Sequence, residues 1–203
     1  MSITHLSTEC AIAEILESST TGWTAQCREL HCAPAFGSFV RAPEDERRAV
    51  VYGVVSHIET VPFDASRRPS ALWTSEDEMD ARHPQIGKLL RTTFAARSIG
   101  WSEGGTIIYS LPQQPPRLHS FTNVCSFEDV RRFTERFEWV RLLMDSSATP
   151  GAGADELLVA VCREAVRAHE NDSKYKIKLG QTLAVPLRAD YHRLRAILSR
   201  LEV

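Results

Sequence analysis

The first half of the chain alternates between short runs rich in apolar and β-branched residues and clusters of turn-forming residues. Two such runs, residues 11–16 and 23–30, are separated by a cluster of serines, threonines and one glycine. Hydroxyl side chains and glycine favour a reversing backbone, so this pattern predicts a β-hairpin. In the second run Trp23, Ala25 and Cys27 share one face, while polar residues occupy the other. We therefore expect a strand that is half exposed.

The same reading predicts two further pairs of strands. Residues 38–41 and 50–59 form the first pair, joined by a charged turn that contains proline, and the second of these strands begins as a continuous apolar run. Such a run is typical of a strand buried in a barrel interior. Residues 92–101 and 106–111 flank a Gly-Gly pair, which predicts a hairpin because both glycines accept a positive φ. Between the two pairs, Pro84 is expected to begin a short helical turn.

The hydrophobic period becomes helical after Cys125. Ser126 is placed to cap a helix, with Asp129 as its third residue. Six apolar side chains recur every three or four positions along one stripe of this helix: Phe127, Val130, Phe133, Phe137, Val140 and Met144. The pattern predicts one continuous amphipathic helix.

Three more helical segments are expected, over residues 155–168, 172–184 and 188–201. The last of them carries an apolar stripe formed by Leu187, Tyr191, Leu194, Ile197, Leu198 and Leu201. The fold class expected from these patterns is α+β, in which an N-terminal antiparallel β-barrel precedes a C-terminal bundle of three to four helices. We assign residues 1–125 to the barrel domain and residues 126–203 to the helical domain.

Composition narrows the possible functions. The chain has 24 basic and 26 acidic side chains and a formal charge of -2, which removes the global attraction that most nucleic-acid-binding proteins use. No apolar run approaches the roughly 20 residues that cross a bilayer, and the first residues lack the pattern of a secretory signal. We therefore expect a cytoplasmic protein without membrane insertion.

The five cysteines are an odd number and are scattered along the chain, so we expect reduced thiols and no disulfide framework. Cys162 lies on the apolar side of its predicted helix and is expected in the core.

Two short motifs carry a resemblance to a known family. Gly37-Ser38-Phe39-Val40, followed by Val51-Tyr52-Gly53-Val54-Val55, resembles the HAS-barrel family. This β-barrel is shared by HerA-type ATPases and the catalytic subunits of the rotary ATP synthase. Residues 17–27, the turn at 109–112, residues 118–121 and the closing helices are similar to a group of bacterial stand-alone HAS-barrel proteins, so the resemblance covers the whole chain.

The resemblance implies a docking module and transfers no catalytic residue. In the large ATPases, the barrel packs beside neighbouring barrels in a ring while a separate domain binds the nucleotide. This chain departs from that arrangement, because its Gly87-Lys88 pair is followed by Leu89 instead of serine or threonine, and Arg82 stands where a Walker loop has its first glycine. Without that cradle we do not expect ATP hydrolysis, and we expect no cofactor.

A zinc or cysteine-dependent enzyme is a weaker alternative. Cys27, His31 and Cys32 lie within six residues, and His57 is available from another strand. However, on a continuous strand Cys27 and His31 would face one way and Cys32 the other, and the segment contains no Cys-x-x-Cys pair. Two thiols and a histidine at the rim of the barrel are the simpler explanation of the segment. A cysteine nucleophile with His31 or His119 as its base would also need a third group to orient that base.

Single-stranded nucleic-acid binding by an OB-like barrel surface is the main alternative function. Six residues offer charges for phosphates or rings for stacking: Arg67, Arg68, Trp73, Arg91, Arg97 and Trp101. The net charge and the absence of an aromatic ladder on any one predicted strand count against it. The leading hypothesis is therefore a non-catalytic adaptor or assembly module that binds a protein partner, such as an ATPase or a larger complex.

Overall fold

The computed structural model describes most of the chain, namely residues 12–43, 49–64, 66, 71, 85–144 and 153–201. The strands are β1 Ala13–Ser19, β2 Gly22–Cys27, β3 Phe39–Pro43, β4 Val50–Pro62, β5 Leu90–Glu103, β6 Thr106–Ile108 and β7 Phe121–Val124. The helices are α2 Gln85–Leu89, α3 Phe127–Thr134, α4 Trp139–Met144, α5 Ala154–Ala168, α6 Ser173–Ala184 and α7 Tyr191–Leu201.

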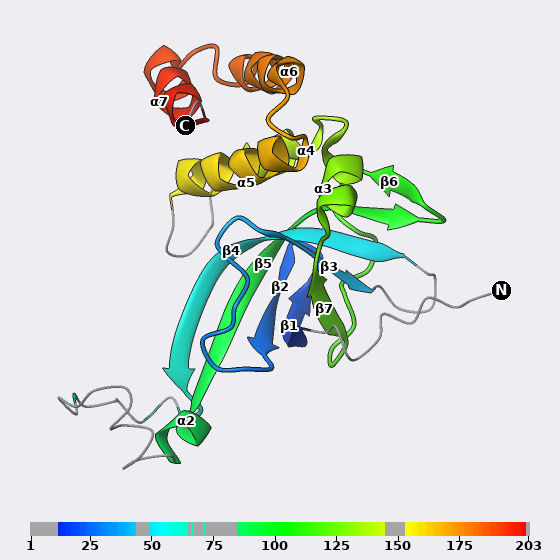
Figure 1. Cartoon of the computed structure of the whole chain (residues 1–203). Coiled ribbons are helices and arrows are strands. Elements are labelled where there is room, and N and C mark those ends of the chain that lie inside the picture. The colour runs from blue at the N-terminus through cyan, green and yellow to red at the C-terminus, as the bar shows by residue number, and fades with distance from the viewer. Residues whose placement is uncertain are drawn as a thin grey trace.

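Six strands close into an antiparallel barrel. The order β2-β1-β7-β3-β4-β5 is completed by pairing of β5 with β2, while β6 continues from β5 as a hairpin outside the ring (Figure 1). The α+β class and the antiparallel barrel are thus confirmed. The hydrophobic pattern did not predict β7, although this strand closes the ring between β1 and β3.

Three local features predicted from turn-forming residues are confirmed by the structure. The first hairpin reverses between β1 and β2, and the second reverses at Gly104 and Gly105, whose φ angles are 57° and 87°. A short helix, α2, is present over Gln85–Leu89 as expected, while Pro84 itself lies outside the described residues. The proposed turn at residues 44–48 lies outside the described residues.

Two bulges and a glycine allow the long strands β4 and β5 to curve around the barrel. Strands β4 and β5 change register twice, at Tyr52/Gly53 and at Val55/His57, and each bulge bends and twists the ribbon. Gly53 faces the interior, where a Cβ atom would lie 2.5 Å from Cη2 of Trp23. The indole ring therefore fills the space that a side chain at this position would need.

The barrel strands bury residues on both faces. The interior holds Val51 and Val55 of β4, together with the rings of Trp23, Phe94 and Trp101. The outer face of the same region is covered by helices. The apolar run in β4 was expected to be buried in the barrel interior, and this holds for Val51 and Val55. Tyr52 and Val54 instead pack outward against the helical layer.

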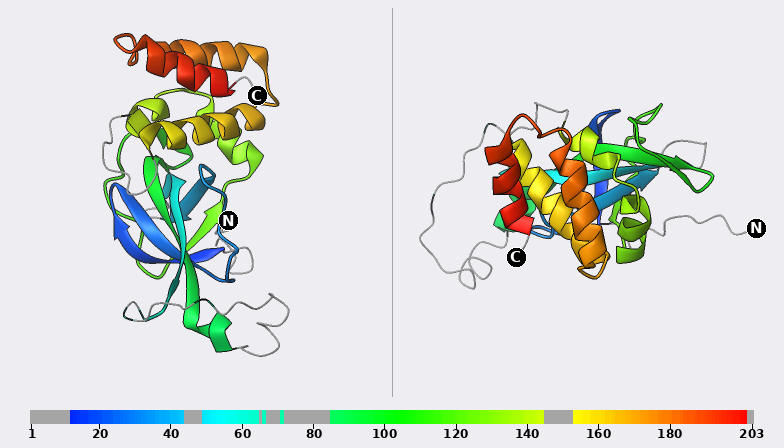
Figure 2. Two further views of the ribbon diagram at one scale, coloured as in Figure 1. Left: turned by 90° about the vertical axis from the view of Figure 1, so that its left-hand side faces the viewer. Right: turned by 90° about the horizontal axis from the view of Figure 1, so that it is seen from above.

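The helices form two levels on this covered face. Helices α3, α4 and α5 lie next to the barrel, and α6 and α7 lie beyond α5 (Figures 1 and 2). Phe133 of α3 links barrel and helices, since its ring centroid lies 6.2 Å from that of Phe39, 4.8 Å from that of Tyr52 and 5.4 Å from that of Tyr109. One apolar cluster therefore runs from the barrel wall to the outermost helices.

The predicted helix after Cys125 is in fact two helices. Its capping box is confirmed, because the Ser126 side chain accepts from the Asp129 backbone and the Asp129 side chain accepts from the Ser126 backbone. The helix stops at Thr134 because two distant hydroxyls hold its last carbonyls: Tyr109 donates to the Phe133 carbonyl at 2.7 Å, and Tyr175 donates to the Thr134 carbonyl at 3.1 Å. The chain then turns and starts α4.

Ion pairs attach α7 to α5. Arg193 contacts Asp155 at 2.7 Å, and Arg200 contacts Glu156 at 2.5 Å. Helix α5 matches its prediction closely, whereas α7 begins three residues later than expected. None of the helices in the described ranges combines the length and apolar character that a membrane crossing needs.

Candidate interaction surfaces

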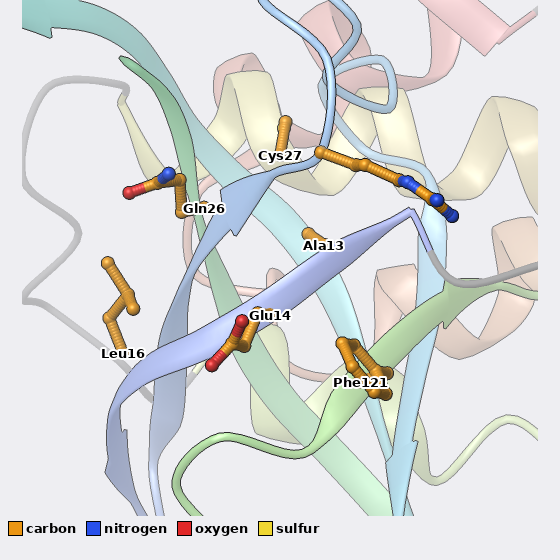
Figure 3. Close-up of a pocket in the computed structure, with 7 residues that line it drawn as sticks. Ala13, Glu14, Leu16, Gln26, Cys27 and Phe121 are labelled. Atoms are coloured by element: carbon orange, nitrogen blue, oxygen red, sulfur yellow. The ribbon is translucent and has the colours of Figure 1, made fainter. Parts of the chain in front are cut away.

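The barrel face opposite the helices contains a shallow hollow. We call it the barrel hollow; it measures about 370 Å³ and is lined by Ala13, Glu14, Leu16, Gln26, Cys27, Arg28 and Phe121. These residues come from β1, from the end of β2 and the residue after it, and from β7 (Figure 3). Glu14 and Phe121 are direct partners across the β1–β7 pair, and the Glu14 carboxylate lies 2.8 Å from Nδ1 of His119. The hollow thus combines apolar side chains with charges of both signs.

The proposed metal ligands do not share a strand. Strand β2 ends at Cys27, and the following residues turn, with His31 at a φ of 63°. The strand predicted over residues 23–30 therefore ends three residues earlier than expected. His31 approaches the Thr60 hydroxyl at 3.5 Å, and His57 lies 3.7 Å from a carboxylate oxygen of Glu59. Among the residues that the structure describes, no group of three or more His, Cys, Asp or Glu could hold a metal ion.

Burial makes three thiols poor nucleophiles. It raises the pKa of Cys27 to about 11, with the charge of nearby Cys32 as a smaller cause. Burial also raises the pKa of Cys125 and of Cys162 to about 12. A thiolate is the reactive form of cysteine, so these groups are almost entirely inactive at neutral pH. Cys32, by contrast, is exposed.

The three described candidates for nucleic-acid contact, Arg91, Arg97 and Trp101, all lie on β5 but have different surroundings. Trp101 is only 5% exposed, and its ring packs in the barrel interior, with the indole N–H donating to Ser110 Oγ at 3.2 Å. Arg97 donates to the Leu142 carbonyl in α4, and Arg91 lies over the ring of Phe63 at 5.8 Å. Trp101 therefore presents no ring for stacking with a base.

The other three proposed contacts, Arg67, Arg68 and Trp73, lie outside the described residues.

The second candidate surface lies on the outermost helices. Ile177, Val185 and Tyr191 are 61%, 71% and 68% exposed, the highest values among the exposed large apolar side chains of the described ranges. All three belong to α6, to α7 or to the turn between them. Tyr191 also lines a groove of about 350 Å³, which we call the α7 groove; the other lining residues are Leu194, Arg195, Leu198 and Ser199.

This outer pair of helices is basic. Residues 172–201 contain seven lysines and arginines but only two acidic side chains. Two of the seven are the arginines that pair with α5. The other five form no ion pair with any described residue: Lys174, Lys176, Lys178, Arg188 and Arg195.

The sequence reasoning missed this surface, because the net charge of the whole chain conceals it. A local signal was present, since three of the four lysines in the chain lie on α6.

Comparison with known proteins gives no relative from which a function could be transferred. No model of a known protein family matches the chain, and no curated protein is similar to it.

Proposed function

We propose that the chain is a non-catalytic adaptor or assembly module that binds a protein partner, and that its barrel is of the HAS type. The observation that carries this proposal is the concentration of exposed apolar side chains on the outermost helices. Ile177, Val185 and Tyr191 belong to α6, to the turn that follows it and to α7. This basic helical pair stands beyond α5, away from the barrel (Figure 1). Strong exposure of large apolar side chains on one helical pair favours a surface that a partner covers.

The barrel suits the role of a scaffold. Its interior is filled by Trp23, Phe94 and Trp101 together with smaller apolar residues, and three of its strands bury their outer faces beneath helices. A packed barrel of this type supports surfaces for recognition. The motifs around Gly37 and Gly53 support the HAS assignment, and they favour a partner such as an ATPase or a larger complex.

The state of the buried thiols agrees with a non-catalytic role. Cys27, Cys125 and Cys162 all have a raised pKa because they are packed among apolar side chains. Catalytic cysteines lie instead in electropositive surroundings that lower the pKa.

Capture of the tagged full chain from its own cells at native salt, followed by native mass spectrometry, tests the proposal. We expect a protein partner at a fixed stoichiometry. Recovery of the chain alone, with and without a mild cross-linker, would overturn the proposal.

Single-stranded nucleic-acid binding is tested in parallel by fluorescence anisotropy with labelled DNA and RNA. Binding that weakens steeply with salt would favour this alternative, because released counterions make such binding salt-dependent. A null result at low salt would remove it.

A further inference from the structure

We propose that the α7 groove binds an acidic amphipathic helix of the partner protein. This inference rests on the proposed function, and it adds the location of the docking surface and the chemistry of what docks there. Three observations carry it: the spacing of the groove residues, the way in which α7 is attached to α5, and the charge around the groove.

The groove residues follow a helical stripe. Tyr191, Leu194, Arg195, Leu198 and Ser199 stand at positions i, i+3, i+4, i+7 and i+8 of α7. With a rise of about 1.5 Å per residue, the stripe is about 12 Å long, which matches about two turns of a second helix. Side chains at this spacing are those that interlock when two helices pack, and a helix laid in an apolar groove is a recurring mode of peptide recognition.

This stripe extends beyond the face that holds α7 in the fold. Ile197 is buried in the main apolar cluster, and Arg193 contacts Asp155 of α5 through three hydrogen bonds of 2.7 to 3.1 Å. Leu194 and Leu198 pack against the same cluster but are only partly buried, and Tyr191 projects into solvent. The inner part of the stripe therefore anchors the helix in the fold, while its outer part remains open.

The charge near the groove selects an acidic partner. Arg195 lines the groove itself, and Arg188 is exposed in the turn that precedes α7. Neither forms an ion pair within the described part of the chain. Glutamates that flank the apolar stripe of a docked helix would meet these guanidinium groups, and Arg is well suited to paired contacts with carboxylates.

The same features disfavour other occupants. A second copy that docked through its own α7 would bring Arg195 next to another arginine, and such like-charge contacts are costly. A bilayer is flat, whereas Leu194 and Leu198 line a hollow and are partly buried. A nucleic-acid strand would need several cations along its path, but the lining contains a single guanidinium group, that of Arg195.

A designed peptide provides the probe. It is a labelled helix of about 18 residues, or about five turns, with leucines at i, i+3 and i+7 and glutamates on both flanks. A second peptide is identical except that lysines replace the glutamates. Fluorescence anisotropy with the full chain should show binding of the acidic peptide, weaker binding at higher salt, and at least tenfold weaker binding of the basic peptide.

Charge reversal then locates the site. Arg195→Glu should weaken the acidic peptide at least tenfold and strengthen the basic one, whereas Lys88→Glu, the same charge reversal at the exposed end of α2, should change neither. Tyr191→Glu should abolish binding without unfolding the protein, because this ring is mostly exposed. Leu118→Glu alters an exposed leucine elsewhere and should have no effect.

Equal binding of the two peptides, no binding of either, or insensitivity to Arg195→Glu would overturn the inference. Sedimentation of the chain with vesicles of phosphatidylserine and phosphatidylcholine, lost in Arg195→Glu, would instead assign the surface to a membrane. A dimer lost in the same variant would assign it to a second copy.

Failure here is distinguishable from failure of the proposed function. A cellular partner that is captured equally by the wild-type chain and by the Arg195→Glu and Tyr191→Glu variants leaves the adaptor role intact and removes only this surface.

Discussion

Replacement of Phe133 by alanine is the sharpest test of how barrel and helices are joined. Phe133 is fully buried, and its ring contacts the rings of Phe39 and Tyr52 in the barrel strands and of Tyr109 after β6. Truncation of a buried phenylalanine costs about 3–5 kcal/mol, because transfer energy is lost and a cavity remains. Aromatic contacts add about 0.5–1.5 kcal/mol for each pair. We therefore expect Phe133→Ala to lower the free energy of unfolding by about 5 kcal/mol, the upper end of the range for a buried phenylalanine.

Urea unfolding followed by tryptophan fluorescence measures this loss. Trp139 reports on the helical layer, because it is fully buried in α4 and its ring lies 6.3 Å from that of Phe39. Trp23 and Trp101 report on the barrel interior. If the continuous apolar cluster makes barrel and helices one cooperative unit, both signals should shift together to lower urea in Phe133→Ala.

The same helix supplies a matched control. Phe127 is 59% exposed at the start of α3, so Phe127→Ala should change the free energy of unfolding by no more than about 0.5 kcal/mol. A loss below about 1 kcal/mol in Phe133→Ala, or an equal loss in the two variants, would refute the packing argument. A barrel signal that stays in place while the helical signal shifts would show that the two layers unfold separately.

Three further outcomes follow from glycine packing, a partly buried histidine and thiol burial. Gly53→Ala should lower the free energy of unfolding by about 1–3 kcal/mol in thermal or urea unfolding, because the new Cβ would overlap the indole ring of Trp23. In the control Gly87→Ala the new Cβ meets open space, so the free energy of unfolding should stay unchanged or rise by up to about 1 kcal/mol. Equal losses in the two variants would disprove the clash. Burial, with the neighbouring Arg131 guanidinium as a smaller cause, lowers the pKa of His169 in the folded protein below its usual 6.5. The fold therefore favours the neutral imidazole, and the free energy of unfolding should fall as the pH drops below about 6.5. His169→Gln should lose this part of the pH dependence, and an unchanged pH profile would contradict the assignment. Iodoacetamide at neutral pH should modify exposed Cys32 well before buried Cys162, as read by peptide mass mapping, and equal rates in the folded protein would count against the predicted burial effect.

Local chemistry made parts of the fold readable from the sequence. The Gly104–Gly105 turn and the Ser126 cap were predictable because each depends on residues within a few positions of one another. The buried residues of α5 were predictable for the same reason, since their period is that of the helix itself.

Long-range contacts account for the errors. Strand β7 has only four residues, too few to show an alternation, and it is fixed by pairing with β1, about a hundred positions earlier, and with β3. The break between α3 and α4 depends on hydroxyl groups from Tyr109 and Tyr175, which no local pattern relates to the helix end. The apolar run of β4 showed that the strand is buried, but not that one of its faces lies against helices.

The last helix shows how such a pattern can contain an interaction surface. Its apolar residues were predicted as one stripe, and within that stripe Ile197 is buried, Leu194 and Leu198 are partly covered, and Tyr191 is exposed. The stripe is therefore wider than the face that α5 covers. Apolar positions in excess of what the fold buries have two explanations: incidental exposure, or a partner that completes the packing. The unpaired Arg195 within the same stripe favours the second, because a guanidinium group among leucines gives a docking helix both a register and a required charge.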